Sequence, residues 1–313
     1  MTSTITWDRS RASLIPHSLF DGMSSFLEEM RRHGLAPVDP HAIVPDGVLH
    51  RYTVVADKPS RKNGWYVLNP LWGVAGSFKS GVKFHWHAGK TGQLSLHDRR
   101  ARMQAIRTAQ ALREQEQAER YAHAAEHGAA LWGSLRPATP GHPYLARKHV
   151  PPGPARQLGG VIFLPVTDLD GKLHGLQLID DAGFKWFLKG TRVRGHFVQI
   201  VGHLPNQQVV IGEGYATCAS VAPYFSGATV LAALNCGNLL PVAQNVRARY
   251  PDVDIVIAAD DDQLNPANPG LTAARVAAAA VDARVARPKW PPEISPRASD
   301  FNDLANYLRE HHG

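Results

Sequence analysis

Two stretches decide the fold of this chain: QVVIGEGYATCASV at residues 208–221 and DIVIAADDD at residues 254–262. Each begins with a short apolar run rich in β-branched residues, which is typical of a strand buried on both faces. Each then ends in acidic residues beside Gly or Ala. Because parallel strands end at the same edge of a sheet, and ligands bind at that edge, we expect the acids of both stretches to meet there.

The sequence around these two stretches alternates further strands with helices. Apolar strand-like runs occur at residues 229–234 and 281–287, and helical stretches at 216–225, 239–250 and 270–280. This alternation predicts a parallel sheet covered by helices on both faces. We therefore expect an α/β domain over residues 205–313.

Three acids at this edge have the spacing of a metal site. Asp260 and Asp262 are two residues apart, so in extended chain they face the same side while Asp261 faces away. Together with Glu213 they form a set of hard oxygen ligands that suits Mg²⁺ or Mn²⁺. The alternative is an Asp-rich turn that caps a helix, with Glu213 as an unrelated surface acid.

The order of these elements resembles the Toprim domain of bacterial primases and topoisomerases, on the Glu213-Gly214-Tyr215 turn and the Asp260-x-Asp262 pair. Upstream, HPYLARKHV at 142–150 and the segment 161–190 are similar to the region that precedes Toprim in bacterial-type primases. The stretches GEGYATCASV and SDFNDLA are most similar to the versions found in plasmids, phages and integrative elements. The resemblance covers roughly residues 140–310.

This resemblance implies roles for individual acids. Glu213, Asp260 and Asp262 would be catalytic and would hold the metal, and Asp300 or Asp303 would be a further metal ligand. The chain departs from replicative primases at one position. They usually carry an acid four residues after the Toprim glutamate, where this chain has Thr217, which puts a second tightly held metal in doubt.

Four cations follow in the segment FKWFLKGTRVRG, and the resemblance implies that they meet the phosphates of nucleotide or template. They are Lys185, Lys189, Arg192 and Arg194. Phosphoryl chemistry also needs cations beside a carboxylate-bound metal, because charge develops on the phosphate. The alternative is a set of edge-strand cations that discourages aggregation.

Residues 1–97 predict a small basic α+β domain, with a helix at 20–35 and an antiparallel meander that ends near residue 95. Positions 51–110 hold eleven Lys and Arg against two acids, which favours a polyanionic partner over a merely solvated basic surface. Arg61, Lys62 and Lys83 are the candidate contacts to single-stranded DNA template.

The remaining ranges complete the expected organisation. Residues 98–136 are rich in Arg, Ala, Gln and Glu and contain no Pro until Pro137, which predicts one long connecting helix, polar all round. Residues 137–204 predict a basic subdomain that contains hairpins, placed before the Toprim domain at 205–313.

Composition sets limits on the class of protein. No apolar run approaches the roughly 18 residues that a membrane helix needs, and the first residues lack the pattern of a secretory signal. Two cysteines are too few for a disulfide framework. We therefore expect a cytoplasmic protein that does not act at a membrane.

The hypothesis from sequence is a DNA primase, a DNA-directed RNA polymerase that makes short RNA primers on single-stranded DNA by magnesium-dependent nucleotidyl transfer. Its substrates would be nucleoside triphosphates, its setting the replication or transfer of a mobile element, and its partner a separate replicative helicase. One alternative is a Toprim nuclease that acts on DNA. The other is a non-catalytic protein that binds single-stranded DNA.

Overall fold

The computed structural model describes residues 17–59, 61–88 and 96–312. The chain divides into two compact units, Met1–Glu116 and Gln117–Gly313. The second unit contains both the expected hairpin subdomain and the expected α/β domain, whose separate boundaries stay predictions.

The first unit is a helix on a four-stranded antiparallel sheet, as the sequence predicts. The helix is α1 (His17–Arg32), and the strands, in spatial order, are β1 (Leu49–Tyr52), β2 (Gly64–Leu68), β3 (Trp72–Ser77) and β4 (Lys83–His87). Phe26 and Met30 of α1 are fully buried in a core with Phe84 and Trp86 of β4. Residues alternate along β4, so Lys83 is exposed.

The predicted long helix is present as α2 (Leu96–Ser134). Within the second unit its end is not polar all round, because Ala124 is buried and Leu131 and Trp132 pack on an apolar cluster. Gly128 explains the close approach of this helix to strand β8, since a Cβ there would lie 3.4 Å from the Cα of Gly175. The expectation that this helix is polar all round is therefore wrong at its C-terminal end.

A five-stranded antiparallel sheet follows and confirms the predicted hairpins. Its strands, in spatial order, are β5 (Arg136–Pro137), β6 (Arg156–Leu158), β7 (Val161–Thr167), β8 (Leu173–Asp180) and β9 (Lys185–Phe187). A short helix, α3 (Pro143–Lys148), lies between β5 and β6 in the sequence.

The second sheet of this unit is mostly parallel, as expected. Its strands, in spatial order, are β10 (Val198–Val201), β12 (Thr229–Ala232), β11 (Gln208–Gly212), β13 (Asp254–Ala258) and β14 (Arg284–Ala286). Strands β11 to β14 are parallel, whereas β10 pairs antiparallel with β12 at the edge. Strand β10 lies in the range expected for the preceding subdomain, yet its hydrogen bonds place it in this sheet.

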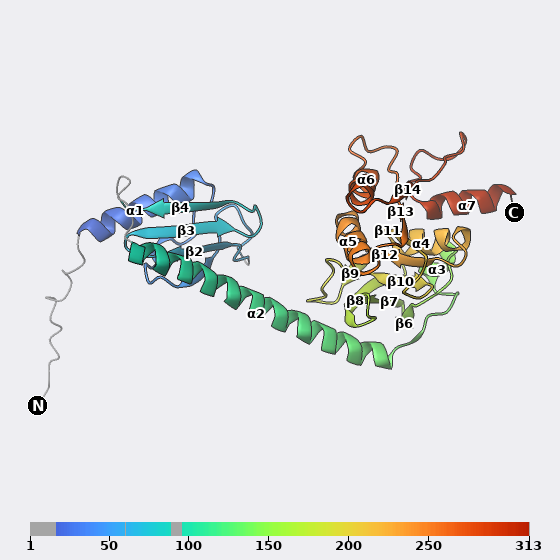
Figure 1. Cartoon of the computed structure of the whole chain (residues 1–313), viewed down its shortest axis with the longest axis horizontal. Coiled ribbons are helices and arrows are strands. Elements are labelled where there is room, and N and C mark those ends of the chain that lie inside the picture. Colours follow the sequence, from blue (N-terminus) through green and yellow to red (C-terminus); the bar gives the residue numbers. More distant parts are fainter. Residues whose placement is uncertain (1–16, 60, 89–95, 313) are drawn as a thin grey trace, which may run out of the picture. The chain divides into compact units, whose positions relative to one another are not determined.

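Both faces of this sheet are covered. Helices α5 (Leu239–Arg249) and α6 (Pro269–Val281) lie on one face, and α4 (Tyr215–Val221) lies on the other with α7 (Phe301–His312) packed against it (Figure 1). Residues alternate between the two cores along each strand, so that Val210 faces the α4 side and Val209 the α5 side. The core on the α4 side of this sheet also includes residues of β7 and β8.

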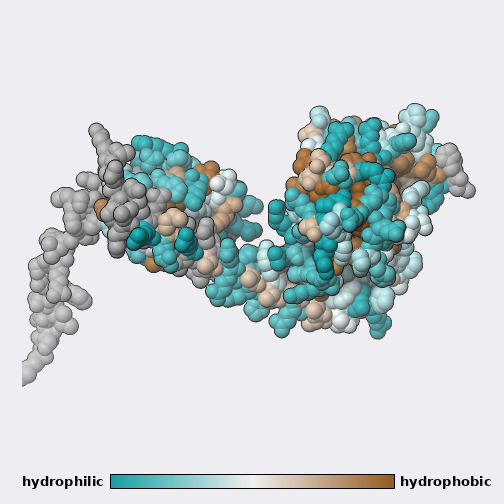
Figure 2. All heavy atoms as spheres, in the orientation of Figure 1, coloured by the Kyte–Doolittle hydropathy of each residue, from teal (hydrophilic) through white to brown (hydrophobic). Residues whose placement is uncertain are grey.

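Hydrophilic side chains cover most of the visible part of α2 in Figure 2. In the part of the chain that the structure describes, no helix has the length and apolar character needed to cross a membrane.

Candidate active site

The acids predicted to meet are placed at one edge of the parallel sheet. Glu213 directly follows Gly212, the last residue of β11, and Asp260 lies two residues after Ala258, the last residue of β13. Gly212 and Ala258 are paired in the register of these two neighbouring parallel strands. The sheet therefore brings Glu213 and Asp260 to the same carboxyl edge.

Asp260 is the most perturbed acid of this edge. Its Oδ1 atom is buried and has no hydrogen-bond partner, and a Cβ on Gly270 would lie only 3.0 Å from the Cβ and carbonyl oxygen of Asp260. The pKa of Asp260 is raised to about 8, mainly by burial and then by the charges of Glu213, Asp300 and Asp262, in that order. An acid with this pKa is mostly protonated at pH 7 unless a cation neutralises the site.

Glu213 is affected by the same surroundings. Burial is the largest cause that raises its pKa, and the charges of Asp262 and Asp300 add to it. The backbone N–H of Cys236 and the charge of Lys185 act in the opposite direction and lower the pKa. One backbone N–H thus holds the Glu213 carboxylate in place, and the charges of the neighbouring acids disfavour its ionised form.

Asp261 faces away from these acids, as the alternation predicts. Its Oδ1 accepts a hydrogen bond from Asn268 Nδ2 at 2.7 Å, and its Oδ2 accepts one from Trp290 Nε1 at 3.1 Å. Its backbone N–H donates to the carbonyl of Ser299 at 2.6 Å. Asp261 therefore has a structural role, which is to fix the loop that carries Asp260 and Asp262.

The structure separates the two acids of the SDFND segment. Asp300 Oδ2 accepts a hydrogen bond from Thr217 Oγ1 at 3.1 Å, and its charge raises the pKa values of Glu213 and Asp260. Asp303 instead accepts a hydrogen bond from the Ser299 N–H at 2.9 Å and lies 3.7 Å from Lys148 Nζ. Asp300 belongs with the other acids, and Asp303 stabilises the start of α7.

The expected cage is more open than predicted. Among the described residues, no three of these acids have ligand atoms that all lie within 4.8 Å of one another. The unpartnered buried oxygen of Asp260 and the mutually raised pKa values still fit a divalent cation. Mg²⁺ keeps several water ligands, so it does not need every carboxylate in direct contact.

Of the four predicted cations, Lys185 is the one placed beside the acids. Its Nζ would lie 3.9 Å from a Cβ on Gly214, and its charge lowers the pKa values of Glu213 and Asp260. Lys189 is exposed after β9.

The two arginines of that segment are in the loop before β10. The guanidinium of Arg192 lies 5.5 Å from the ring centre of Tyr121, and the carbonyl of Arg194 accepts a hydrogen bond from His196. In the first unit, Arg61, Lys62 and Lys83 are exposed.

Sequence reasoning missed two groups that shape this site. One is the Thr217 hydroxyl, which binds Asp300, and the other is the Cys236 N–H, which binds Glu213. The position of Thr217, four residues after Glu213 on α4, was the available signal. No local pattern indicates the contact from Cys236.

The family comparison agrees with this geometry. Residues 208–310 match the Toprim domain family. The C-terminal part of this chain is a Toprim domain. All the acids of the site lie inside the matched Toprim range, so the predicted resemblance is confirmed for the segment that holds them.

Two curated relatives are DNA primases named TraC from Escherichia coli. They are 36% identical over 284 residues and 33% identical over 289 residues, and each alignment covers 85% of this chain. The alignments cover 26% and 19% of the two relatives, so the chain spans about a quarter or less of their length. The similarity to plasmid-type primases thus extends beyond the Toprim domain in this chain.

Solved structures of primases are more distantly similar. The catalytic domain of DnaG primase bound to single-stranded DNA is 11% identical, with 62% of this chain and 77% of that chain covered and a TM-score of 0.42. The primase fragment of the bacteriophage T7 primase-helicase is 16% identical, with 50% and 63% covered and a TM-score of 0.36. The primase relationship therefore rests on the TraC relatives.

Proposed function

We propose that this chain is a DNA primase, which joins ribonucleotides into short RNA primers on single-stranded DNA during the replication or transfer of a mobile element. The observation that carries the proposal is the group of acids at one edge of the Toprim sheet, where the buried Oδ1 of Asp260 has no hydrogen-bond partner and the pKa of Asp260 is raised to about 8. The similarity to the TraC primases supports the reaction class, a nucleotidyl transfer.

The acids Glu213, Asp260, Asp262 and Asp300 would hold a divalent cation, Mg²⁺ or Mn²⁺. Bound there, the ion would neutralise phosphate charge and lower the pKa of the attacking 3′-hydroxyl. Asp260 would give up its proton when the ion binds, because the cation favours the ionised carboxylate. Thr217 would keep Asp300 oriented through its 3.1 Å hydrogen bond.

Lys185 would bind the triphosphate of the incoming nucleotide. Its ammonium is exposed at the edge where the acids lie, and it is the cation that lowers the pKa values of both Glu213 and Asp260. A cation in this position offsets the repulsion between the acids and a triphosphate. Lys189, Arg192 and Arg194 would extend the basic surface to the template or the nucleotide.

The first unit would bind the single-stranded template. Exposed Arg61, Lys62 and Lys83 supply positive charge on its surface. Phe78 is 45% exposed, and the guanidinium of Arg51 lies 5.1 Å from its ring centre. Aromatic rings flanked by cations bind unpaired bases by stacking without a requirement for sequence.

A primer-synthesis assay tests the proposal. The chain is incubated with single-stranded circular DNA, labelled ribonucleotides and Mg²⁺, and short labelled products are expected that require both template and metal. Glu213→Gln should lower the yield by about 100-fold or more, because it removes one of the charges that hold the ion. The control Glu293→Gln, at an exposed acid, should stay within about twofold of the parent.

The same assay separates the rival activities. If the parent makes no primers but shortens labelled single-stranded DNA with Mg²⁺ alone, and Glu213→Gln does not, the protein is a nuclease. If the parent does neither and only retains DNA, it is a binding protein. Primer synthesis at the parental level in Glu213→Gln would contradict the proposed role of the acids.

A further inference from the structure

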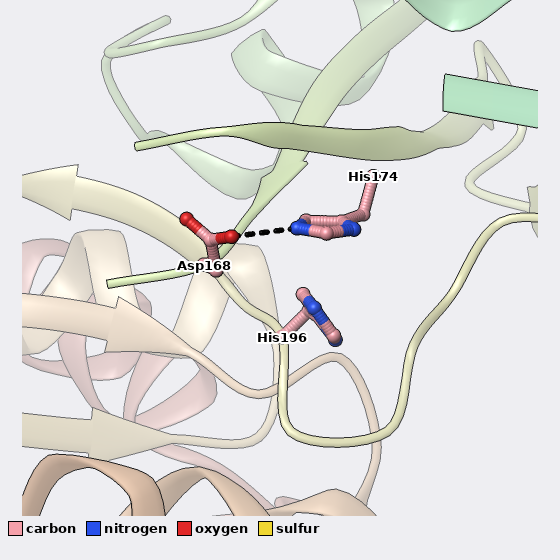
Figure 3. Close-up of side chains that lie close together, drawn as sticks. All are labelled: Asp168, His174 and His196. Atoms are coloured by element: carbon pink, nitrogen blue, oxygen red, sulfur yellow. Dashed lines mark hydrogen bonds and ion pairs between the residues drawn. The ribbon is translucent and has the colours of Figure 1, made fainter. Parts of the chain in front are cut away.

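A second group of metal-type ligands lies away from the Toprim acids in sequence. Asp168 follows β7, His174 lies in β8, and His196 lies in the loop before β10 (Figure 3). A carboxylate oxygen and one ring nitrogen from each histidine all lie within 4.8 Å of one another. The His174 Nε2 and Asp168 Oδ2 atoms are 2.7 Å apart, and the two imidazole ring centres are 4.0 Å apart.

Backbone hydrogen bonds hold the carboxylate of this group in place. Asp168 Oδ1 accepts hydrogen bonds from the backbone N–H groups of Asp170 at 3.0 Å and Lys172 at 2.9 Å, which close the turn of the β7–β8 hairpin. This leaves Oδ2 directed at His174. The carboxylate is therefore oriented before any ligand binds.

His196 is oriented in the same way. Its Nδ1 lies 2.8 Å from the carbonyl oxygen of Arg194, and since a carbonyl only accepts, Nδ1 carries the proton and Nε2 keeps a free lone pair. Histidines that bind metals commonly donate their other ring N–H to a carbonyl in this manner. Asn238 fixes the loop, because it donates to the His196 carbonyl at 2.8 Å and accepts from the Gly195 N–H at 2.7 Å.

The surroundings favour the neutral imidazole that metals require. His196 is 7% exposed, and burial is the main cause that lowers its pKa. The hydrogen bond to the Arg194 carbonyl raises this pKa, the charges of His174 and Arg192 lower it, and the charge of Asp168 raises it. An open hollow of about 360 Å³, lined by Asp168, His196, Asn245 and Arg249 among others, leaves room for a solvent ligand.

We propose that Asp168, His174 and His196 bind a divalent transition-metal ion of the Zn²⁺ type, at a site separate from the Toprim acids. Two imidazoles and a carboxylate are the donor set that such ions prefer, whereas Mg²⁺ prefers oxygen ligands alone. Ligands of a tetrahedral Zn²⁺ lie about 3.3 Å apart, so the His174–Asp168 pair must open by roughly 0.6 Å to admit the ion.

The consequence of binding is local order. The ion would tie the loop that contains Arg192 and Arg194 to the β7–β8 hairpin, because His196 belongs to that loop and the other two ligands belong to the hairpin. A role in presenting these arginines to phosphates rests on the proposed primase function. Binding of the ion does not.

Titration of the full chain with Zn²⁺ by calorimetry, in the presence of excess Mg²⁺, tests this site. The parent should bind one high-affinity equivalent, and His196→Gln and His174→Gln should each weaken binding by about 100-fold. The control His203→Gln, at an exposed histidine, should bind as the parent does. Substitution by Co²⁺ should give the intense visible absorption of a tetrahedral site in the parent and in His203→Gln.

Asp260→Asn separates this proposal from the primase function, because it should keep the Zn²⁺ equivalent while it binds the metal at the Toprim acids more weakly. Melting temperatures without metal show whether each variant folds. If the parent binds no Zn²⁺, or if folded His174→Gln and His196→Gln bind it as tightly as His203→Gln, the three side chains are a hydrogen-bonded structural group and the proposal is wrong.

Discussion

The two ends of strand β13 carry the same residue type in opposite circumstances. Asp254 begins the strand, where its carboxylate accepts hydrogen bonds from Gln208 Nε2 at 2.6 Å and Arg284 Nη2 at 2.5 Å. These partners lower its pKa. Asp260 lies just beyond the other end, its buried Oδ1 has no hydrogen-bond partner, and its pKa is raised to about 8.

This contrast distinguishes a residue that stabilises the fold, Asp254, from a residue that we assign to function, Asp260. Asp254 stabilises the folded state in its ionised form, whereas an ionised Asp260 destabilises it. A buried carboxylate oxygen without a hydrogen-bond partner is maintained only where the fold gains something other than stability. The carboxyl end of the strand is where ligands of such sheets bind, and we assign the metal to that end.

The largest expected effect is on primer synthesis. Asp260→Asn should lower the rate by about 100-fold or more, because it removes the ionised ligand while it keeps the shape. Asp254→Asn, the matched change at the other end of β13, should stay within about twofold of the parent. Both rates are measured with labelled ribonucleotides on single-stranded DNA, and equal rates for the two variants would remove the distinction between the strand ends.

The next effect is on stability without metal. The folded state binds a proton at Asp260 more tightly than the unfolded state. The contribution of this group to the free energy of unfolding is therefore fully present below pH 4 and is lost as the pH rises to about 8. Each unit of this pKa difference corresponds to about 1.4 kcal/mol. Urea unfolding at pH 5, 7 and 9 in EDTA should therefore show Asp260→Asn progressively more stable than the parent.

The control in that experiment is Mg²⁺, which should restore much of the stability of the parent at pH 9 and little of that of Asp260→Asn. A parent and an Asp260→Asn variant whose free energies of unfolding stay parallel from pH 5 to 9 would show that the carboxyl is not perturbed.

A smaller effect is expected at Lys185. Lys185→Met should lower primer synthesis by about tenfold, mainly through a higher KM for nucleotide, because a cation that offsets acid–triphosphate repulsion is lost. Lys172→Met, in the turn between β7 and β8, keeps the same change of charge at an exposed position and should have little effect. An unchanged KM in Lys185→Met would assign triphosphate binding to another cation.

The smallest effect belongs to the ion pair of Asp254. Its partner Arg284 is 67% exposed, and exposed pairs contribute about 0.2–1 kcal/mol, less at high salt. Asp254→Asn should therefore lower the free energy of unfolding by that amount at pH 7. The loss should disappear as the pH falls through the lowered pKa of Asp254, which is opposite in sign to the behaviour of Asp260. A loss that persists at pH 2 would indicate a different cause.

The parallel sheet and its acids could be predicted because their signals are local. Apolar β-branched runs followed by Glu213 and by Asp260-x-Asp262 indicate both the strands and the edge at which they end. Strand β10 was missed because a short edge strand before a proline-containing loop does not reveal its partner. Its antiparallel pairing with β12 is a tertiary property.

The choice between Asp300 and Asp303 could not be made from sequence. Both acids lie at the start of the same helix, and tertiary contacts such as the hydrogen bond from Thr217 to Asp300 and the proximity of Lys148 to Asp303 distinguish them. The Asp168, His174 and His196 group was missed for the same reason. Its members are spread over three elements, and the hairpin and the isolated pairing of Thr167 with Phe197 bring them together.

Magnesium binding by the parent and by Asp260→Asn, measured calorimetrically in buffers of different ionisation enthalpy, tests the assignment of the acids most directly. Because Asp260 is mostly protonated at pH 7, binding should release close to one proton per ion, and this release should vanish near pH 9.5. Asp260→Asn should bind Mg²⁺ at least about tenfold more weakly and release no proton. Equal affinity and equal proton release in the two proteins would show that the ion, if bound, is not held by the acids of this edge.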